Sequence, residues 1–325
     1  LLLKDAMIGT ALVDMYTKLG EMARAQRLFD ELPFRDIVTW CVLISGYADH
    51  GQGQAALNCY DCMQRNGIFP NEIILSCVLK ACGSTGSLEK GKDFHNEIVA
   101  KGFLKTNIAL GNALVDMYAK CGAIREAQEA FGHLPTRNVA SWSTLFMGYV
   151  ENGQCEEALD LFEEMQCYDS IDPDVVSFIC ILKACGLIGA LDKGEKIHSK
   201  ICQMGLFTNN LSIGNALVDM YAKCGQVKRA QEIFDQLSNP NSVSWSIIIS
   251  GHVQHGQGKE ALECFEKIKK QGVYMDAPTY ANVLKACGII GDFKKGFEVH
   301  DLVIRERFLE EDSSLGAALV DMYAK

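Results

Sequence analysis

A ten-residue segment that recurs four times constrains this chain more than any other feature. Gly111–Lys120 reads GNALVDMYAK and returns unchanged at Gly214–Lys223. Two further copies, Gly9–Lys18 and Gly316–Lys325, differ from it at two positions and at one position, respectively. A sequence that repeats at a fixed period, here about 102 residues, predicts an array of stacked units rather than two or three independent globular domains.

The recurring phrases divide the chain into three kinds of unit that follow one another in a strict cycle. Short units comprise residues 6–36, 108–138 and 211–241, and intermediate units comprise residues 37–71, 139–174 and 242–276. Long units comprise residues 72–107, 175–210 and 277–312. Residues 1–5 are the predicted end of another long unit, and residues 313–325 are the predicted start of another short unit. We therefore expect one repeat array over residues 1–325, cut from a longer protein.

Each unit reads as two helices joined by a tight turn, as the short unit 108–138 illustrates. An apolar stripe at helical spacing runs from Ala113 to Tyr118, and Gly122 then offers a left-handed cap that ends the helix. A second apolar stripe runs to Leu134. The first helices of the intermediate units are expected to end likewise at Gly51, Gly153 and Gly256. One hairpin cannot bury both of its stripes, so neighbouring hairpins must stack. The predicted fold class is all-α, a right-handed α-solenoid of helix-turn-helix units.

Composition agrees with an ordered helical chain. Hydrophobic residues make up 48% of the 325 residues and charged residues 22%, and no apolar run approaches the ~18 residues of a membrane helix. The formal net charge of −10 counts against generic, salt-driven binding of nucleic acid, which needs a basic surface. Any interpretation as a nucleic-acid-binding protein must therefore explain where basic groups gather.

Most of the 14 cysteines keep the phase of the repeat, which indicates packing rather than disulfide formation. One shared position holds Cys82, Cys185 and Cys287, each directly before a glycine at an expected helix end. Cys121 and Cys224 share another. A free cysteine behaves as a small buried hydrophobic residue, whereas a disulfide framework is typical of small secreted domains. We expect reduced thiols in an intracellular compartment.

One position of the repeated phrase varies while its neighbours stay fixed, and we call it the variable slot. The variable slot of the short units, complete and partial, holds Thr10, Asn112, Asn215 and Ala317, and that of the intermediate units holds Cys41, Ser143 and Ser246. A packing position would not change among small polar residues in this way, whereas a position that reads a ligand would. Amide and hydroxyl groups donate and accept hydrogen bonds and so can distinguish base edges. The alternative is a solvated position that is free to drift.

The repeated phrases resemble the plant pentatricopeptide repeat family. The resemblance rests on Val38-Thr39-Trp40, on the segments Leu43–Tyr47 and Ala158–Phe162, and on Gly111–Lys120. The cyclic unit lengths are similar to those of its subclass with short, normal and long repeats, and the resemblance covers essentially the whole chain. It implies sequence-specific binding of single-stranded organellar RNA at about one base per repeat. Members of this subclass often serve cytidine-to-uridine editing.

In the family, the residue in the variable slot selects a base together with the last residue of the same unit, which we call the closing residue. Three pairs imply guanine: Thr10 with Asp36, Ser143 with Asp174, and Ser246 with Asp276. Two pairs imply a pyrimidine: Asn112 with Asn138, and Asn215 with Asn241. Ser76 with Asn107 implies adenine, although the long units read less regularly. Pairs that depart from the family's usual combinations are Cys41 with Asn71, Ile179 with Asn210, and Ala281 with Asp312. The implied tract, 5′ to 3′ along the chain, is G-?-A-Y-G-?-Y-G-?.

Two further sets of residues share the helix face of the variable slot. Three residues before the slot, the family has a side chain that wedges against the base, and the matching residues here are Met7, Val38, Ala109, Ala140, Ser212 and Val243. Candidate phosphate contacts are Lys80, Lys120, Lys183, Lys223 and Lys285, which keep the phase of the repeat. For Lys120 and Lys223 the alternative is an ion pair with an aspartate one turn earlier, near a helix C-terminus. A row of lysines along the first helices is compatible with RNA binding despite the net charge of −10, if the acidic residues lie on the second helices.

Several other motifs are better explained by packing. The tryptophans share one position beside the variable slot, which favours contact between helices over stacking on bases: Trp40, Trp142 and Trp245. Cys59 and Cys62 supply only two of the four ligands that a structural zinc site needs. His95-x-Glu97 lacks the Pro-Cys-x-x-Cys segment of zinc deaminases. Gly86–Lys92 has the glycine spacing of a P-loop without its final Ser or Thr or a preceding strand.

These observations lead to the hypothesis of an RNA-binding α-solenoid that is not itself an enzyme. We expect no cofactor, metal, membrane or small-molecule substrate, a monomeric state, and editing-factor proteins as further partners. The resemblance alone implies a mitochondrial or chloroplast location. The alternative from another class is a protein-interaction scaffold, because helical-hairpin solenoids commonly bind peptides. A third interpretation makes the chain the targeting half of an editing enzyme whose catalytic domain lies beyond Lys325.

Overall fold

Helices account for all the regular secondary structure of the described residues, which are 6–168, 171–208, 210–308 and 313–324 of a computed structural model. The predicted partial unit 1–5, Asp312 and Lys325 lie outside these ranges. The all-α class expected from the two apolar stripes of each unit is confirmed. The chain divides into two compact units, Leu1–Asp172 and Pro173–Lys325, and each is described by itself.

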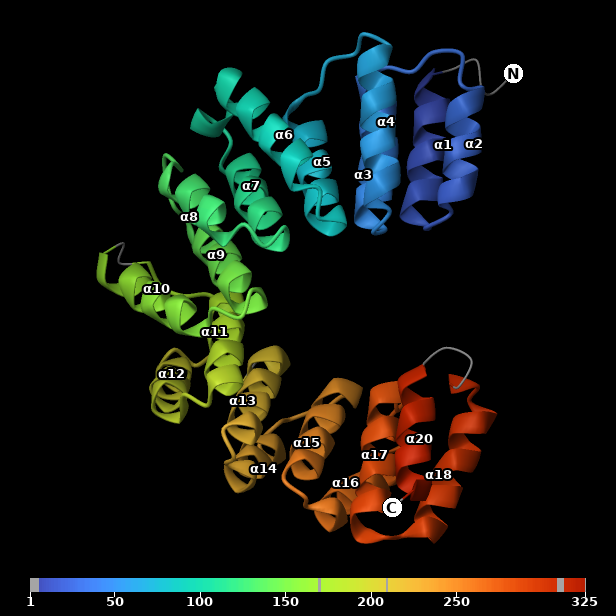
Figure 1. The fold of residues 1–325 in the computed structure, drawn as a ribbon, viewed down its shortest axis with the longest axis vertical. Coiled ribbons are helices and arrows are strands. Elements are labelled where there is room, and N and C mark those ends of the chain that lie inside the picture. The colour runs from blue at the N-terminus through green and yellow to red at the C-terminus, as the bar shows by residue number, and fades with distance from the viewer. Residues whose placement is uncertain (1–5, 169–170, 209, 309–312, 325) are drawn as a thin grey trace. The chain divides into compact units, whose positions relative to one another are not determined.

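The first compact unit is a series of helical hairpins that follow one another in chain order (Figure 1). The hairpins are α1 (Ala6–Lys18) with α2 (Met22–Glu31), α3 (Ile37–Asp49) with α4 (Gly53–Arg65), α5 (Glu72–Thr85) with α6 (Leu88–Ala100), α7 (Ile108–Lys120) with α8 (Ile124–Gly132), and α9 (Val139–Glu151) with α10 (Cys155–Tyr168). A short 3₁₀ helix, η2 (Phe103–Lys105), precedes α7.

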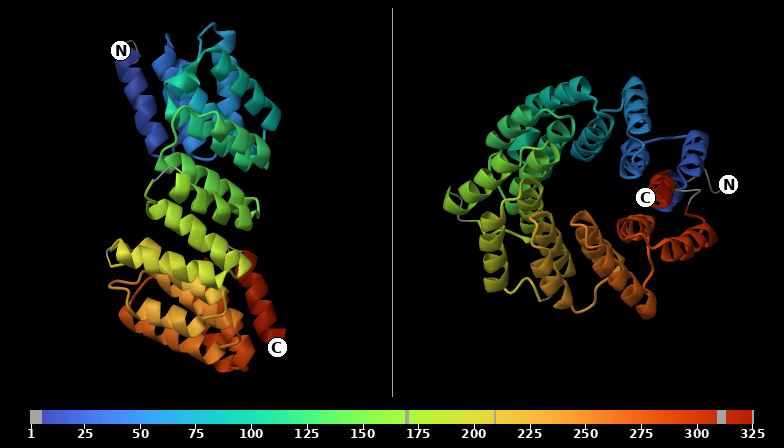
Figure 2. Two further views of the ribbon diagram at one scale, coloured as in Figure 1. Left: turned by 90° about the vertical axis from the view of Figure 1, so that its left-hand side faces the viewer. Right: turned by 60° about the horizontal axis from the view of Figure 1, so that its bottom comes forward.

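The second compact unit continues the pattern, as the further views of Figure 2 also show. Its hairpins are α11 (Val175–Ile188) with α12 (Leu191–Gln203), α13 (Leu211–Lys223) with α14 (Val227–Asp235), α15 (Ser242–Gln254) with α16 (Gly258–Gln271), and α17 (Ala277–Ile290) with α18 (Phe293–Arg305), followed by α20 (Ser313–Ala324).

Within each compact unit, the first helices of successive hairpins form one continuous layer. Helices α1, α3, α5, α7 and α9 contact one another in sequence, and so do α11, α13, α15, α17 and α20. Each second helix packs against its own partner, and, where a first helix follows in the same compact unit, against that helix too, as α4 does against α3 and α5. A ligand that follows the layer of first helices within one compact unit would therefore meet the repeat units of that part in chain order.

The three tryptophans fix the packing between one hairpin and the next. Trp40, Trp142 and Trp245 are 4%, 1% and 3% exposed, so they lie in the core. Each meets the phenylalanine of the preceding second helix edge to face, with ring centroids 4.7 Å apart, in the pairs Phe29–Trp40, Phe131–Trp142 and Phe234–Trp245. The expectation that they pack between helices is confirmed, and they cannot stack on bases.

Glycine begins each repeated phrase, and in the first three copies a Cβ atom at that glycine would meet the leucine at the end of the same hairpin, which would have to shift. A Cβ atom on Gly111 would lie 2.3 Å from a methyl group of Leu134, at the end of the same hairpin. Gly122 has a different role: its φ of +75° places it in the left-handed conformation that ends α7, as the sequence predicts. The repeated segment thus encodes both the close approach and the turn of its hairpin.

The cysteine position of the long units does not end a helix, so that expectation was wrong. Helix α5 continues past Cys82 to Thr85 and ends at Gly86, which has a left-handed φ of +66°. Cys82 is fully buried, and Gly83 faces α7, where its Cβ would approach the Lys120 side chain to 3.2 Å. The glycine after the cysteine is needed for helix contact rather than for a turn. No disulfide joins the cysteines in the part of the chain that the structure describes.

A half-buried histidine recurs in the long units, and two of these histidines predict a pH dependence of stability. His95 and His198 each form a ring-nitrogen hydrogen bond with a tyrosine hydroxyl of the next first helix, to Tyr118 at 2.8 Å and to Tyr221 at 2.9 Å. Burial lowers the pKa of both histidines, aided by the nearby His133 and Arg229, respectively. The folded chain therefore holds these rings neutral at a pH at which the unfolded chain protonates them.

We expect the thermal midpoint to be lower at about pH 5.5 than at about pH 7.5, because the histidine contribution is complete above the unfolded pKa of ~6.5 and is lost as the pH falls through the lowered folded pKa. Thermal unfolding followed by circular dichroism at both pH values measures this. The double variant His95→Gln, His198→Gln serves as the control and should show a smaller difference. A double variant with the full wild-type pH dependence would contradict the assignment.

Candidate nucleic-acid interface

The variable slot lies on the first helices, at the side where each faces its successor. Thr10 on α1 shows this directly, because its hydroxyl lies 2.9 Å from the hydroxyl of Thr39 on α3. The slot residues Cys41, Ser76, Asn112, Asn215 and Ser246 are partly buried, as Thr10 is. Ser143 and Ala281 are 5% and 9% exposed. The variable slot is therefore a position at the edge of the helix contact rather than a freely solvated one.

Asparagine in the variable slot leaves a polar atom without a partner. The Oδ1 atoms of Asn112 and Asn215 are buried, and neither accepts a hydrogen bond from any residue that the structure describes. An unsatisfied buried carbonyl costs about 1–3 kcal/mol, so packing alone does not favour asparagine here. Two equivalent positions, Asn112 and Asn215, carry the same cost.

The closing residues have a structural role that their place in the sequence repeat did not suggest. Each closing residue that the structure describes is the N-cap of the next first helix, and its side-chain oxygen accepts a hydrogen bond from the backbone N–H three residues later. The capping residues are Asp36, Asn71, Asn107, Asn138, Asp174, Asn210, Asn241 and Asp276. Asp and Asn are preferred N-caps, and losing one costs about 0.5–2 kcal/mol. Capping therefore explains why Asp or Asn occurs there, but it does not explain the choice between the two.

A second hydrogen bond often supplements the cap. The hydroxyl of Thr39 donates to the same Asp36 Oδ1 that accepts its backbone N–H, at 2.7 and 2.9 Å. These two bonds lower the pKa of the Asp36 carboxyl, the backbone one more strongly, so it stays ionised at neutral pH. We call such side chains capping hydroxyls, and they are Thr39, Ser141, Ser177, Ser244 and Thr279. A Ser or Thr three residues after Asp or Asn was the sequence signal that could have found them.

The closing residues of two long units differ from the others in backbone conformation and in hydrogen bonding. Asn107 and Asn210 cap α7 and α13 with ψ angles of 94° and 99°, whereas the other closing residues lie within about 11° of ±180°. The residues three positions later are Leu110 and Ile213, which carry no hydroxyl. The Asn107 amide also donates to the Glu72 carboxylate. The amide group of Asn107 is thus already engaged, which makes it a poorer candidate for reading a base.

Aliphatic side chains lie exposed at the wedge position. Val38 and Val243 are 55% and 50% exposed. Ile73 and Val176 were not among the residues expected from the sequence, but they hold the same place in two long units and are 61% and 50% exposed. The regular unit length was the signal that could have found them. Branched apolar residues that repeatedly face solvent on one helix layer offer a flat surface against which a base can lie.

The phased lysines are exposed, but most are already paired. Lys120 and Lys223 each lie 2.7 Å from the aspartate four residues earlier. Lys80 lies 2.7 Å from Asp49 at the end of α3, an unexpected partner from the neighbouring first helix. Lys183 and Lys285 form no ion pair within the described residues. Exposed pairs of this kind are worth at most about 1 kcal/mol, so a phosphate group can displace the aspartate.

Acidic residues are concentrated on the second helices. Helices α11 and α17 each carry a single charged residue, Lys183 and Lys285, and α15 carries no Asp, Glu, Lys or Arg. In contrast, α10 carries Glu156, Glu157, Asp160, Glu163 and Glu164 and no basic residue. The net charge of −10 therefore does not describe the layer of first helices.

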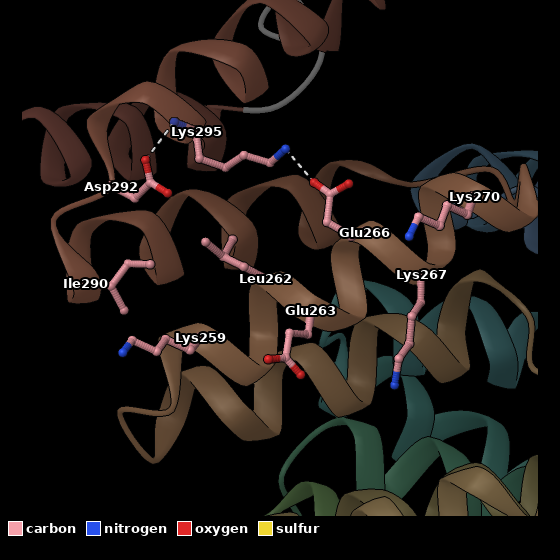
Figure 3. Close-up of a pocket in the computed structure, with 9 residues that line it drawn as sticks. All are labelled: Lys259, Leu262, Glu263, Glu266, Lys267, Lys270, Ile290, Asp292 and Lys295. Atoms are coloured by element: carbon pink, nitrogen blue, oxygen red, sulfur yellow. Dashed lines mark hydrogen bonds and ion pairs between the residues drawn. The ribbon is translucent and has the colours of Figure 1, made fainter.

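A pocket elsewhere on the surface does not involve the variable slot. It has a volume of about 560 Å³ and lies between α16 and the start of α18 (Figure 3). Lys295 pairs with Glu266 across it, as the figure shows. No group of histidines, cysteines and carboxylates suited to a metal ion occurs in the described ranges. None of the described helices is both long and apolar enough to cross a membrane.

Comparison with known families identifies the repeat. A model of the PPR repeat family matches residues 35–84, 137–187 and 240–288, and a second model, PPR repeat, matches residues 10–37, 73–103, 112–139 and 215–239. Together these segments span most of the chain. The chain belongs to the pentatricopeptide repeat family, as its sequence predicts.

Curated relatives and solved structures agree with this assignment. A chloroplastic pentatricopeptide repeat-containing protein of Arabidopsis thaliana is 36% identical over 88% of this chain and 46% of its own length. A mitochondrial one from the same plant is 31% identical over 99% of this chain and 57% of its own length. The chain thus spans about half the length of these relatives. The crystal structure of the pentatricopeptide repeat protein PPR10 in complex with an 18-nucleotide psaJ RNA element matches 98% of this chain and 46% of that one, with a TM-score of 0.73 and 18% identity. This likeness shows the solenoid fold.

Proposed function

We propose that this chain binds a specific single-stranded RNA along its layer of first helices, about one base per unit, through the variable slot and the closing residue. The observation that carries the proposal is the pair of buried, unpartnered Oδ1 atoms of Asn112 and Asn215. The exposed wedge residues and the exposed lysines on the same helices support it. So does the RNA bound by PPR10, a member of the same family.

The assignment of bases follows the family's pairing rules. The complete pairs give the tract G-?-A-Y-G-?-Y-G-?, with the third position weakest because Asn107 is bonded to Glu72. The repeat boundaries at residues 36, 71, 107, 138, 174, 210, 241 and 276 belong to the same proposal, since each places one slot and one closing residue in a unit. The names of the relatives support a chloroplast or mitochondrial location. A role in RNA processing or cytidine-to-uridine editing, with editing-factor partners, would depend on parts of a longer protein.

Two RNAs test the proposal. One carries G-N-A-C-G-N-C-G-N, and the other exchanges the purines and pyrimidines at the assigned positions. A mismatched base in a DNA site costs about 1–3 kcal/mol of binding free energy. If a mismatch costs as much here, a few units that select their predicted base should separate the two affinities by more than about tenfold. Binding is measured by fluorescence anisotropy at moderate salt. Equal weak binding that fades with salt would reduce the interaction to electrostatics, and no binding to either RNA would favour a protein partner instead.

A further inference from the structure

We infer that the capping hydroxyls are positioning residues for base selection, because they fix which atom the closing residue presents to the RNA. The inference rests on the proposed function and deepens it. It concerns Thr39, Ser141, Ser177, Ser244 and Thr279, none of which contacts RNA in the proposal itself. All five are at most 1% exposed, so water does not compete for their hydrogen bonds.

For aspartate, the capping hydroxyl leaves one carboxylate oxygen for the ligand. Asp36 Oδ1 accepts from both the nitrogen and the hydroxyl of Thr39. Asp276 Oδ1 accepts from Thr279 in the same way, at 3.0 and 2.5 Å. One hydrogen bond permits rotation about its axis, whereas two from different directions hold the carboxylate plane. The capping donors bond to Oδ1 alone, so the other oxygen, Oδ2, of Asp36 and of Asp276 remains for the ligand.

For asparagine, the same pair of donors fixes the orientation of the amide. Asn138 Oδ1 accepts from the nitrogen and the hydroxyl of Ser141, each at 2.9 Å. Asn241 accepts from Ser244 likewise, with both distances 3.0 Å. Because the backbone N–H and the hydroxyl of the serine both donate, the amide oxygen must face them. The amide nitrogen must then lie on the side away from the serine. At equivalent positions, aspartate presents an acceptor and asparagine presents a donor.

This difference matches the edges of the bases. The Watson–Crick edge of guanine carries the donors N1–H and N2–H₂, which an acceptor recognises. The edge of cytosine carries the acceptors N3 and O2, which a donor recognises. A closing residue that could rotate would offer either kind of atom less strictly. The capping hydroxyl therefore turns the choice of Asp or Asn into a choice of base.

In the unit 6–36 a single hydroxyl holds both candidate readout residues. Thr39 has one hydroxyl proton, and it is donated to Asp36 Oδ1 at 2.7 Å. In the 2.9 Å contact between the Thr10 and Thr39 hydroxyls, Thr10 must then be the donor. The oxygen atoms of Thr10 and Asp36 can therefore each accept a hydrogen bond from the ligand. Two acceptors match the two donors of guanine, N1–H and N2–H₂.

The unit 37–71 is a natural contrast. Its closing residue, Asn71, has nearly the same backbone angles as Asp36, with φ of −94° and ψ of 177°. The residue three positions later is Ile74, so only the backbone N–H bonds to Asn71 Oδ1. We expect this unit to discriminate among bases less than the units that carry a capping hydroxyl.

The test compares wild type, Thr39→Val and Thr39→Ser on the full chain. Valine keeps the shape of threonine without the hydroxyl, and serine keeps the hydroxyl. Each protein binds two RNAs that carry the predicted tract with guanine or adenine at the first position. Wild type should prefer guanine by at least roughly fivefold. Thr39→Val should lower that ratio by roughly three- to tenfold, the effect of one hydrogen bond, and Thr39→Ser should retain it.

A second pair of RNAs, with guanine or adenine at the fifth position, serves as the internal control. The ratio there, set by the unit 139–174, should be the same in all three proteins, because a general loss of stability would change both ratios. A wild-type ratio that survives in Thr39→Val would overturn the positioning role and leave RNA binding intact. A wild-type ratio near 1 at the first position, with tight binding to both RNAs, would overturn base selection in this unit and the positioning role with it.

Discussion

Asn112→Ser is expected to change the base preferred at the fourth position of the tract from cytosine to adenine. By the family's pairing rules, asparagine with Asn138 selects a pyrimidine, whereas serine with asparagine selects adenine. The physical reason is size as well as hydrogen bonding, since the shorter serine leaves room for the larger base. The affinity ratio for RNAs with cytosine and adenine at this position should reverse, with about 1–3 kcal/mol lost for cytosine. Anisotropy titrations with both RNAs measure the change.

The same substitution should not reduce stability. The Oδ1 atom of Asn112 is buried without a partner, so serine removes an uncompensated desolvation cost of about 1–3 kcal/mol. The equivalent position of the fourth copy is Ala317, which shows that a small side chain is compatible with this helix. The matched control is Asn215→Ser, which should move the preference at the seventh position and leave the fourth unchanged. A loss of both stability and base preference would show that the slot is a packing position.

Trp245→Ala is expected to lower the free energy of unfolding by about 3–5 kcal/mol. The indole is 3% exposed and packs edge to face on Phe234, so its removal leaves a cavity between α14 and α15. Repeat stability is carried by neighbouring interfaces, so the loss should be concentrated in the hairpins on either side. Urea unfolding followed by circular dichroism gives the free energy, and hydrogen exchange of α14 and α15 gives its location.

Two variants calibrate this result. Trp245→Phe should cost much less than alanine, because it keeps most of the buried area and removes an indole N–H that is buried with no partner among the described residues. Phe34→Ala, at a side chain that is 78% exposed, should change stability by less than about 0.5 kcal/mol. A tryptophan whose loss reduced RNA affinity but not stability would reverse its assignment to the core.

Much of the candidate site could be predicted because its residues follow the repeat. The variable slot was found from Thr10, Asn112 and Asn215, which change while their neighbours do not. The core role of Trp245 followed from its constant position. In contrast, the pairing of Lys80 with Asp49 could not be predicted, because it joins successive first helices and no sequence spacing of three or four residues reveals it.

The closing residues show which features the sequence determines and which features depend on the tertiary structure. The sequence by itself determined the all-α class, the order of the hairpins and the identity of Asp36 and Asn138, since apolar periodicity and repetition are local properties of the chain. Only the tertiary structure decided that Thr10, Thr39 and Asp36 form one hydrogen-bonded chain. The reason is physical: Thr10 and Thr39 lie on different helices, 29 residues apart, and only the stacking of hairpins brings their hydroxyls into contact.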